Sequence, residues 1–136
     1  MNDRFNRFKF RTWNKKTQKM KKVMALISEE GVYYSLMVNE NEAVVEPCEE
    51  PHMVLMQCTG LKDKNCKLIY EGDIINIWCC NLTKNQISSV KYCEERAAFT
   101  FDYLTDCGQI VPCTMEKTKI EVIGNIYENP ELLEEK

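Results

Sequence analysis

The sequence predicts a mostly β protein: a compact, barrel-like sheet, SH3-like around its central segment, with a short C-terminal helix. Short apolar segments alternate with the period of two residues that is typical of strands. Clusters of Gly, Asp, Asn and Ser separate these segments at regular intervals and indicate turns. Many short strands joined by such turns are typical of small barrels and sandwiches. At 136 residues the chain has the length of one domain, so residues 1–136 are expected to form a single domain.

The strand pattern is clearest in the segment from Leu55 to Ile77. Three short strands are predicted within it, over residues 55–59, 67–70 and 74–77. Gly60–Lys67 has the composition of a turn, and Glu71-Gly72-Asp73 that of a tighter one. The two carboxylates of the tight turn are expected to bond to backbone amides and not to act as a catalytic pair.

The remaining elements follow from the same alternation. Further strands are predicted over residues 7–13, 20–27, 32–38, 43–45, 87–93, 97–104, 110–115 and 120–123. Pro112 has no amide hydrogen and therefore marks its strand as an edge strand or an irregular one. Pro130 suits the first turn of a short helix over residues 131–135. Residues 39–52 hold five glutamates and two prolines and are expected to form a loop around the 43–45 strand.

Three segments carry a resemblance to a known family. They read FKFRTWNKKTQKM at residues 8–20, MQCTGLKDKNCKLIYEGDIINI at residues 56–77 and EVIGNIYENPELL at residues 121–133. In content and in order these segments resemble the YopX family of phage and prophage proteins. The resemblance implies a small, mostly β, phage-encoded protein with a barrel-like core and no established chemistry.

One residue departs from the family pattern. The family's central turn has glycine where this chain has Cys66. Hairpin turns commonly need a positive φ at such a position. We therefore expect Cys66 to be held in a conformation that costs a non-glycine residue about 1 kcal/mol.

Composition limits the class of protein. The chain is 44% hydrophobic and 29% charged, as in soluble globular proteins. No apolar run approaches the roughly 20 residues of a membrane span. The early apolar run Val23–Ile27 is too short for the core of a signal peptide. We therefore expect a cytoplasmic protein, and the resemblance to the phage family implies the cytoplasm of a bacterial host.

The chain contains eight cysteines and one histidine, His52. The cysteines are Cys48, Cys58, Cys66, Cys79, Cys80, Cys93, Cys107 and Cys113. None forms the CxxC spacing of a zinc site, so we expect reduced thiols that serve mainly as small apolar residues. A zinc site and a disulfide remain as alternatives. No local signature pairs His52 with a cysteine as a nucleophile, and the glutamates of residues 39–52 lack the spacing of a calcium loop.

Positive charge is concentrated at the N-terminus. Residues 1–22 hold nine basic side chains and one acid, a net charge of +8, within a chain of net charge −3. The rest of the chain holds nine basic and twenty acidic residues, a net charge of −11. Such polarity suits an arm that binds nucleic acid. It also suits a segment that lies against the acidic body of its own chain or of a second copy.

The basic segment supplies the candidate interaction surface. Alternation places Phe8, Phe10 and Thr12 on the core face of the predicted strand and leaves a basic outer face. With the following turn, that outer surface comprises Arg7, Lys9, Arg11, Trp13, Lys15 and Lys16. A solvated strand face, a nucleic-acid surface and a protein-binding surface remain open as interpretations.

The function is predicted to be non-enzymatic. No dinucleotide-binding, P-loop, zinc-protease or nucleophile-elbow motif occurs, so we expect no catalytic residues and no cofactor. We expect a phage or prophage accessory protein that binds another protein, with a host or defence factor as the candidate partner. A nucleic-acid-binding module that uses the rings of Phe8, Phe10 or Trp13 is the alternative, and an enzyme of unrecognised reaction is the second. A homo-oligomer is compatible with the sequence, and no membrane partner is expected.

Overall fold

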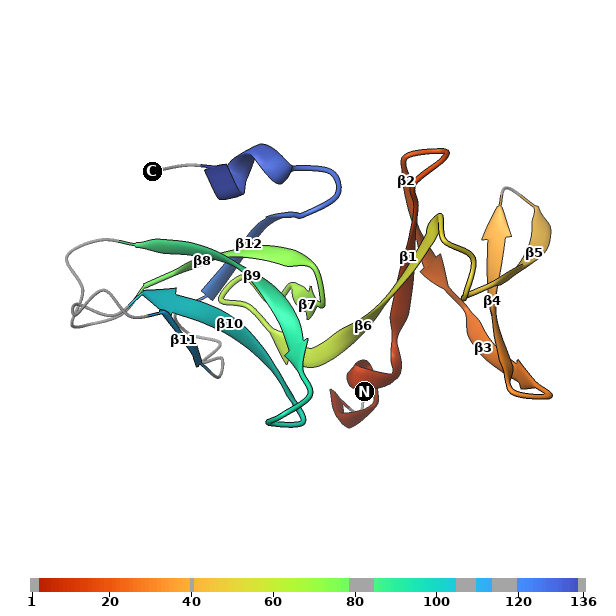
Figure 1. Ribbon diagram of the computed structural model, residues 1–136, viewed down its shortest axis with the longest axis horizontal. Helices are drawn as coiled ribbons and strands as arrows, with labels where there is room; N and C mark the ends of the chain where they lie inside the picture. The colour runs from red at the N-terminus through yellow and green to blue at the C-terminus, as the bar shows by residue number, and fades with distance from the viewer. Residues whose placement is uncertain (1–2, 40, 79–84, 105–109, 114–119, 135–136) are drawn as a thin grey trace. The chain divides into compact units, whose positions relative to one another are not determined.

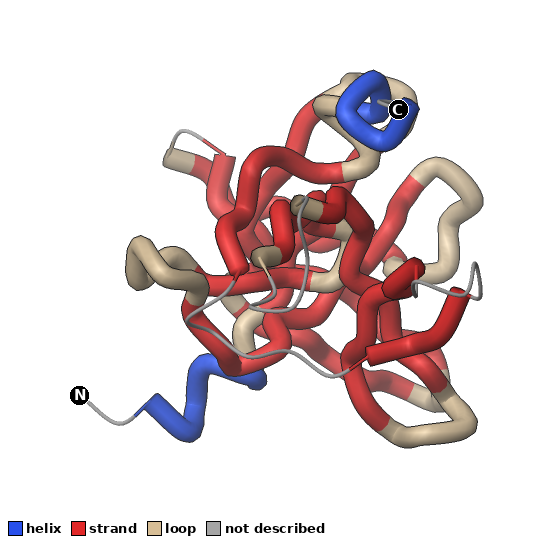
Figure 2. Tube along the Cα trace, turned by 90° about the vertical axis from the view of Figure 1, so that its left-hand side faces the viewer, coloured by secondary structure: helices blue, strands red, loops and turns tan. Residues whose placement is uncertain are grey.

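The chain divides into two compact units in the computed structural model. They span Met1–Cys58 and Thr59–Lys136. The structure describes residues 3–39, 41–78, 85–104, 110–113 and 120–134. Strands dominate both units, and the helical turns among these described residues lie near the two ends of the chain (Figures 1 and 2). The mostly β, barrel-like class is confirmed, whereas the expectation of a single domain stays a prediction.

The first unit contains a three-stranded sheet and the first strands of a four-stranded one. Its elements are the 3-10 helix η1 (Asp3–Phe8), β1 (Phe10–Asn14), β2 (Lys19–Val23), β3 (Ala25–Glu29), β4 (Val32–Asn39), β5 (Glu42–Pro47) and the start of β6 (Met53–Lys62). The order β3-β4-β5 forms the first sheet, and the order β2-β1-β6-β7, in which β7 is Leu68–Tyr70, forms the second. β1 is thus a central strand, paired antiparallel with both β2 and β6.

The second unit is built on a five-stranded antiparallel sheet that curls into a half-barrel (Figure 1). Its elements are β7 (Leu68–Tyr70), β8 (Asp73–Ile77), β9 (Gln86–Cys93), β10 (Ala98–Leu104), β11 (Ile110–Cys113), β12 (Ile120–Asn125) and the 3-10 helix η3 (Pro130–Glu134). The order of the strands is β11-β10-β9-β8-β12. The core packs Ile69, Ile75, Ile77, Val90, Phe101 and Ile120 together.

Several element boundaries differ from the sequence prediction. The strand predicted over residues 20–27 is wrong as one element, because the chain leaves β2 at Val23 and enters a different sheet at β3. Met24 makes this crossing, and its amide donates to the Leu36 carbonyl at 2.8 Å. The C-terminal helix is a single 3-10 turn. Pro112 lies on the edge strand β11, as predicted.

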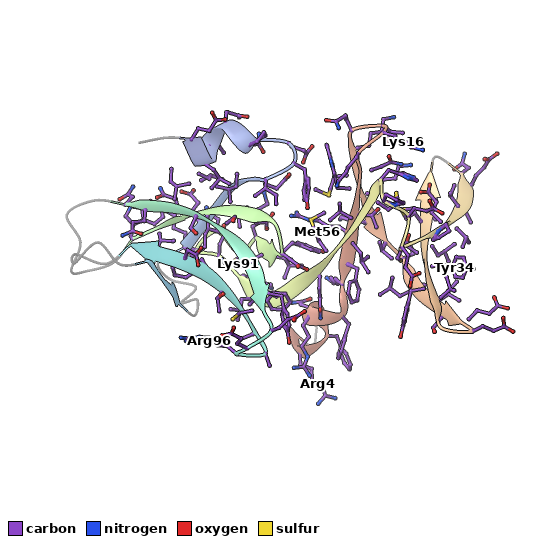
Figure 3. The ribbon with its side chains drawn as sticks, in the orientation of Figure 1. Arg4, Lys16, Tyr34, Met56, Lys91 and Arg96 are labelled. Carbon is purple, nitrogen blue, oxygen red and sulfur yellow. The ribbon has the colours of Figure 1, made fainter. Side chains whose placement is uncertain are left out.

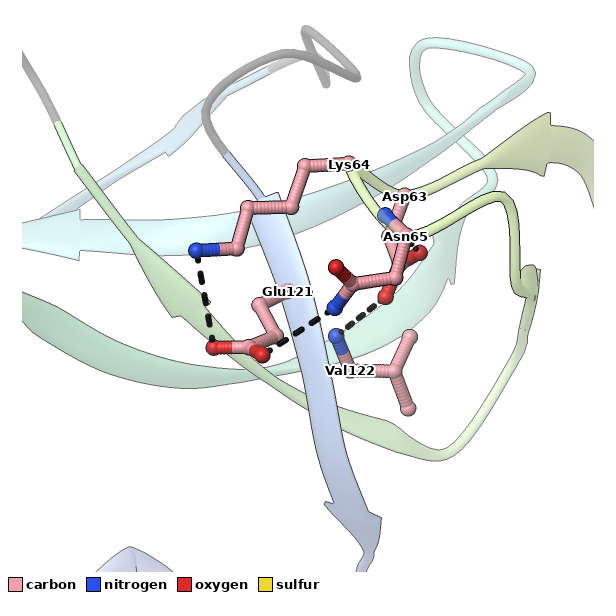
Figure 4. Close-up of polar contacts among 5 residues, drawn as sticks. All are labelled: Asp63, Lys64, Asn65, Glu121 and Val122. Atoms are coloured by element: carbon pink, nitrogen blue, oxygen red, sulfur yellow. Dashed lines mark hydrogen bonds and ion pairs between the residues drawn. The ribbon is translucent and has the colours of Figure 1, made fainter.

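The turn between β6 and β7 is fixed by a buried carboxylate, that of Asp63, which is 4% exposed. Its Oδ1 accepts the amides of Asn65 at 2.8 Å and Lys67 at 2.9 Å. Its Oδ2 accepts the amide of Val122 on β12 at 2.9 Å (Figure 4). Burial raises the pKa of Asp63, but these three hydrogen bonds outweigh burial and hold the pKa below its ordinary value. The carboxylate therefore fastens the turn to β12.

The contacts around this turn are structural. The Asn65 side chain donates to Glu121 Oε2 at 3.1 Å, and Lys64 Nζ lies 3.9 Å from Glu121 Oε1 (Figure 4). In the next turn, the Tyr70 amide donates to Asp73 Oδ2 at 2.7 Å. The prediction that the Glu71-Gly72-Asp73 turn uses a carboxylate to bond a backbone amide is confirmed for Asp73. The segment that looks most distinctive in the sequence thus serves the fold.

Cys66 has a φ of 65° in the same turn, as its place at a glycine position predicts. We expect Cys66→Gly to leave the free energy of unfolding unchanged or to raise it by up to about 1 kcal/mol. Glycine removes the steric penalty of a positive φ, and its extra freedom in the unfolded chain offsets part of the gain. Urea denaturation measures the difference.

Cys93→Gly is the matched control for this substitution. Cys93 lies at the end of β9 without a positive φ, so glycine there should lower the free energy of unfolding by about 1 kcal/mol. A clear loss of stability in Cys66→Gly would show that the Cys66 side chain makes contacts that outweigh the backbone strain.

Candidate functional site

The six residues of the predicted basic surface do not lie on one face. Arg7 ends η1 and Lys9 precedes β1, and both side chains are exposed. Arg11 in β1 is half-buried. Lys15 and Lys16 are exposed in the turn after β1, where the Asn14 side chain accepts the Lys16 amide at 2.9 Å. The sixth residue, Trp13, is buried, although it was predicted to lie on the outer surface.

Trp13 is a core residue and Phe8 is a surface residue, the reverse of the prediction. Trp13 is 4% exposed and Phe8 is 57% exposed. Phe8 is exposed because residues 3–8 form a 3-10 helix and the strand begins only at Phe10. Trp13 is buried because both faces of β1 are covered at this point. The adjacent Thr12 is also buried, and its hydroxyl donates to the sulfur of Met37 at 3.2 Å. A central strand that is covered on both faces hides Trp13 from any partner.

The N-terminal helix η1 presents exposed aromatic rings beside basic groups. Phe5 is 53% exposed, and its ring centroid lies 6.1 Å from that of Phe8. The guanidinium of Arg4 lies 5.1 Å from the Phe5 ring, and that of Arg7 lies 5.2 Å from the Phe8 ring. Exposed rings with neighbouring arginines could contact an unstacked base or an acidic protein surface. The sequence indicated the correct residue types here but the wrong backbone.

A second exposed surface lies on the three-stranded sheet of the first unit. Antiparallel pairing places Ala25 opposite Leu36 and Leu36 opposite Val45, so these residues share one face. We call this face the outer face; its members are Ala25, Ile27, Glu29, Val32, Tyr34, Leu36, Val38, Ala43, Val45 and Pro47. Figure 3 shows Tyr34 on this sheet. Apart from Glu29 at one end, every member is apolar or aromatic.

Part of the outer face is exposed, whereas the opposite face of β4 is buried at Ser35 and Met37, although Tyr33 at one end of that opposite face is 53% exposed. Val38 is 50% exposed and Val45 is 53% exposed, whereas Ser35 and Met37 on the opposite face of β4 are 0% and 2% exposed. The opposite face contacts β1 through the Thr12–Met37 pair and packs into the first unit. Isolated apolar residues are ordinary on protein surfaces, but a contiguous apolar sheet face is typical of an interaction site.

The outer face is not among the surfaces that the sequence predicted. The β4 segment VYYSLMV is apolar at both odd and even positions. That pattern indicates a strand covered on both sides. In the structure only one side is covered within the first unit, and the other side carries the outer face. The sequence therefore shows that β4 is apolar on both faces, but it does not reveal which face is left uncovered by other elements.

The described residues contain no group of three metal-ligating side chains. His52 is half-buried in the turn before β6, and its carbonyl accepts the Lys15 amide at 2.8 Å. Burial raises the pKa of the Cys48 thiol, a hydrogen bond with Ser35 lowers it, and the charge of Glu49 raises it, with a net rise. A raised pKa disfavours the reactive thiolate.

Four cysteines belong to the described residues and are free thiols there: Cys48, Cys58, Cys66 and Cys93. The other four, Cys79, Cys80, Cys107 and Cys113, lie outside the residues whose side chains the structure describes. The absence of zinc and disulfides from the whole chain therefore stays a prediction. No helix in the described part of the chain is long and apolar enough to cross a membrane.

Comparisons with known proteins show what the chain resembles. Residues 9–134 match the family model described as YopX protein. The crystal structure of protein EF1440 from Enterococcus faecalis is 24% identical, covers 92% of this chain and 96% of that chain, and has a TM-score of 0.61. The X-ray structure of YopX from Bacillus subtilis is 23% identical, covers 93% of this chain and 98% of that chain, and has a TM-score of 0.68. No curated protein matches the chain.

Proposed function

The chain belongs to the YopX family, and from that premise we propose that it is a non-enzymatic phage or prophage accessory protein that acts by binding another protein. The observation that carries the proposal is the outer face, an apolar sheet surface with Val38 and Val45 about half exposed. Cores of protein interfaces are enriched in apolar and aromatic side chains and depleted in charge. The outer face has that composition.

Two further observations support binding over catalysis. The buried carboxylate of Asp63 is occupied by two backbone amides of its own turn and by one of β12. The described titratable groups also form no cluster that could hold a metal. A host or defence factor remains the candidate partner, and the host cytoplasm the proposed location.

The proposal is tested by weakening the outer face without disturbing its strands. Val38→Thr with Val45→Thr keeps the β-branched shape and adds two hydroxyls. We expect the Kd of the partner complex to rise about tenfold, because each change removes roughly 0.5–1 kcal/mol of apolar burial. Tagged protein is purified from cells that produce it, and the partner band is compared between the variant and the parent.

Ile87→Thr is the matched control, since Ile87 is 38% exposed on β9 in the second unit. It should leave the partner band unchanged. An unchanged band in the double variant, or an equal loss in the control, would contradict the assignment of binding to the outer face.

Nucleic-acid binding is the second candidate, and the exposed rings of Phe5 and Phe8 beside Arg4 and Arg7 favour it. We nevertheless expect no specific complex with mixed single- or double-stranded DNA or RNA near physiological ionic strength. The chain has a net charge of −3, and its remaining acidic surface repels phosphate. A gel-shift titration at low and physiological salt measures binding.

Neutralising three exposed lysines, Lys15→Gln, Lys16→Gln and Lys19→Gln, provides the comparison. This variant should keep its stability, since exposed charges contribute only about 0–1 kcal/mol each. A tight, salt-sensitive complex that the triple variant abolishes would establish nucleic acid as the ligand and overturn the expected result.

A further inference from the structure

We propose that the outer face takes a basic protein partner, one that presents apolar side chains flanked by Lys or Arg. This inference rests on the proposed function and names the chemistry of its partner. The negative charge around the apolar surface favours a partner of opposite charge. Residues 23–58 contain seven glutamates and neither Lys nor Arg, a net charge of −7. All formal side-chain charge at neutral pH in the sheet and its connecting turns is therefore negative.

Most of these glutamates have no cation of the chain beside them. Six of the seven have described side chains: Glu29, Glu30, Glu42, Glu46, Glu49 and Glu50. None of the six forms an ion pair with another described residue, whereas Lys64–Glu121 and Lys91–Asp102 are ion pairs in the second unit. The described basic groups of residues 1–22 therefore leave these six carboxylates without direct ion pairs, and a basic partner would find them available.

Several of the carboxylates gather at one end of the outer face. Glu29 ends β3 and Glu30 occupies the turn into β4. Backbone pairing brings the chain after β5 to the same end, because the Cys48 amide donates to the Tyr33 carbonyl at 2.9 Å. Glu49 follows directly and is exposed. An apolar centre with an acidic rim at one end is complementary to an apolar surface with a basic rim.

The same charges argue against other occupants. A second copy stacked face to face would bring together two sheets whose residues 23–58 each carry a net charge of −7, and opposed like charges disfavour association. Nucleic acid and anionic lipid are repelled for the same reason. The N-terminal segment of a second copy is basic and aromatic and shares the proposed partner chemistry, so the experiment must separate it from a different protein.

The experiment uses two synthetic peptides with identical apolar residues at alternate positions. One peptide carries Lys at the other positions, and the second carries Glu. Fluorescence anisotropy measures their binding to the full chain at about 0.05 and 0.5 M salt, between which the Debye length falls from roughly 14 to 4 Å. We expect the Lys peptide to bind, with an affinity that falls at high salt, and the Glu peptide to bind at least about tenfold more weakly.

Two variants locate the binding. Glu29→Gln, Glu30→Gln and Glu49→Gln together should weaken the Lys peptide about tenfold, and Val38→Thr with Val45→Thr should weaken it further. The matched control changes an equal number of exposed glutamates in the second unit, Glu94→Gln, Glu95→Gln and Glu131→Gln, and should have no effect. Equal weakening by both charge variants would show attraction to net charge alone and overturn the inference.

The remaining outcomes separate this inference from the proposed function. Equal binding of both peptides that still depends on Val38 and Val45 would overturn the basic partner and leave the binding face intact. Concentration-dependent dimerisation in sedimentation equilibrium that Phe5→Ala with Phe8→Ala abolishes would identify a second copy as the occupant and overturn the inference. If Val38→Thr with Val45→Thr loses the co-purified partner but the chain shows no preference for the Lys peptide, the inference of a basic partner is overturned and the proposed function stands.

Discussion

Trp13→Ala will lower the free energy of unfolding by about 3–5 kcal/mol, the usual effect of truncating a buried Trp. Trp13 is 4% exposed on the central strand β1, with β2 on one side and β6 on the other. Removing the indole leaves a cavity that the neighbouring strands can fill only in part. Urea or thermal denaturation of the full chain measures the loss, with Trp fluorescence replaced by circular dichroism as the probe.

Phe8→Ala is the matched control, because Phe8 is 57% exposed on η1. It should change the free energy of unfolding by no more than about 0.5 kcal/mol. If the two variants had equal stability, Trp13 would have to be a surface residue, as the simple alternation from residue 7 predicts. The two variants together therefore test whether Trp13 is in the core and Phe8 is on the surface.

Asp63→Ala will lower the free energy of unfolding by about 3 kcal/mol. The substitution leaves three backbone amides, those of Asn65, Lys67 and Val122, without their acceptor. A hydrogen bond to a charged group contributes roughly 1.5–3 kcal/mol, and part of the loss is recovered where water reaches the exposed turn. Asp102→Asn is the control: its carboxylate pairs with Lys91 at 2.8 Å but is 44% exposed, so the change should be under about 1 kcal/mol.

The same carboxylate gives the protein a pH dependence of known sign. The pKa of Asp63 is lower in the folded chain than its ordinary value of 3.8. Between the two values the unfolded chain binds more protons than the folded one, so stability rises with pH. The contribution is fully present above the ordinary value and is lost as the pH falls through the lowered pKa. Asp63→Asn should flatten this acid limb of the stability profile, and an unchanged limb would assign it to other groups.

The sequence predicted the fold class because its evidence is local. Period-two alternation and turn residues describe the strands of the second unit closely, from β8 to β10. The conformation of Cys66 followed from a glycine position in the family turn. Pro112 marked an edge strand because it lacks an amide hydrogen. Each of these predictions depends on residues that are neighbours along the chain.

The candidate site could not be predicted in the same way. Phe8 is exposed because it belongs to η1 and not to the strand, and Trp13 is buried because β1 is covered on both faces; local alternation reveals neither. β4 is apolar on both faces, so its sequence does not reveal which face another element covers. Only the register of β3, β4 and β5 assembles the outer face from residues of three strands. Such a surface is a tertiary property.

Site-specific photo-crosslinking tests the outer face most directly. A benzophenone amino acid replaces Val45 on the outer face in one variant and Glu94, an exposed turn residue of the second unit, in another. After irradiation of cells that produce each variant, we expect one discrete crosslinked protein from position 45 and none from position 94. No discrete product from position 45, or the same product from both positions, would contradict a binding surface on this sheet.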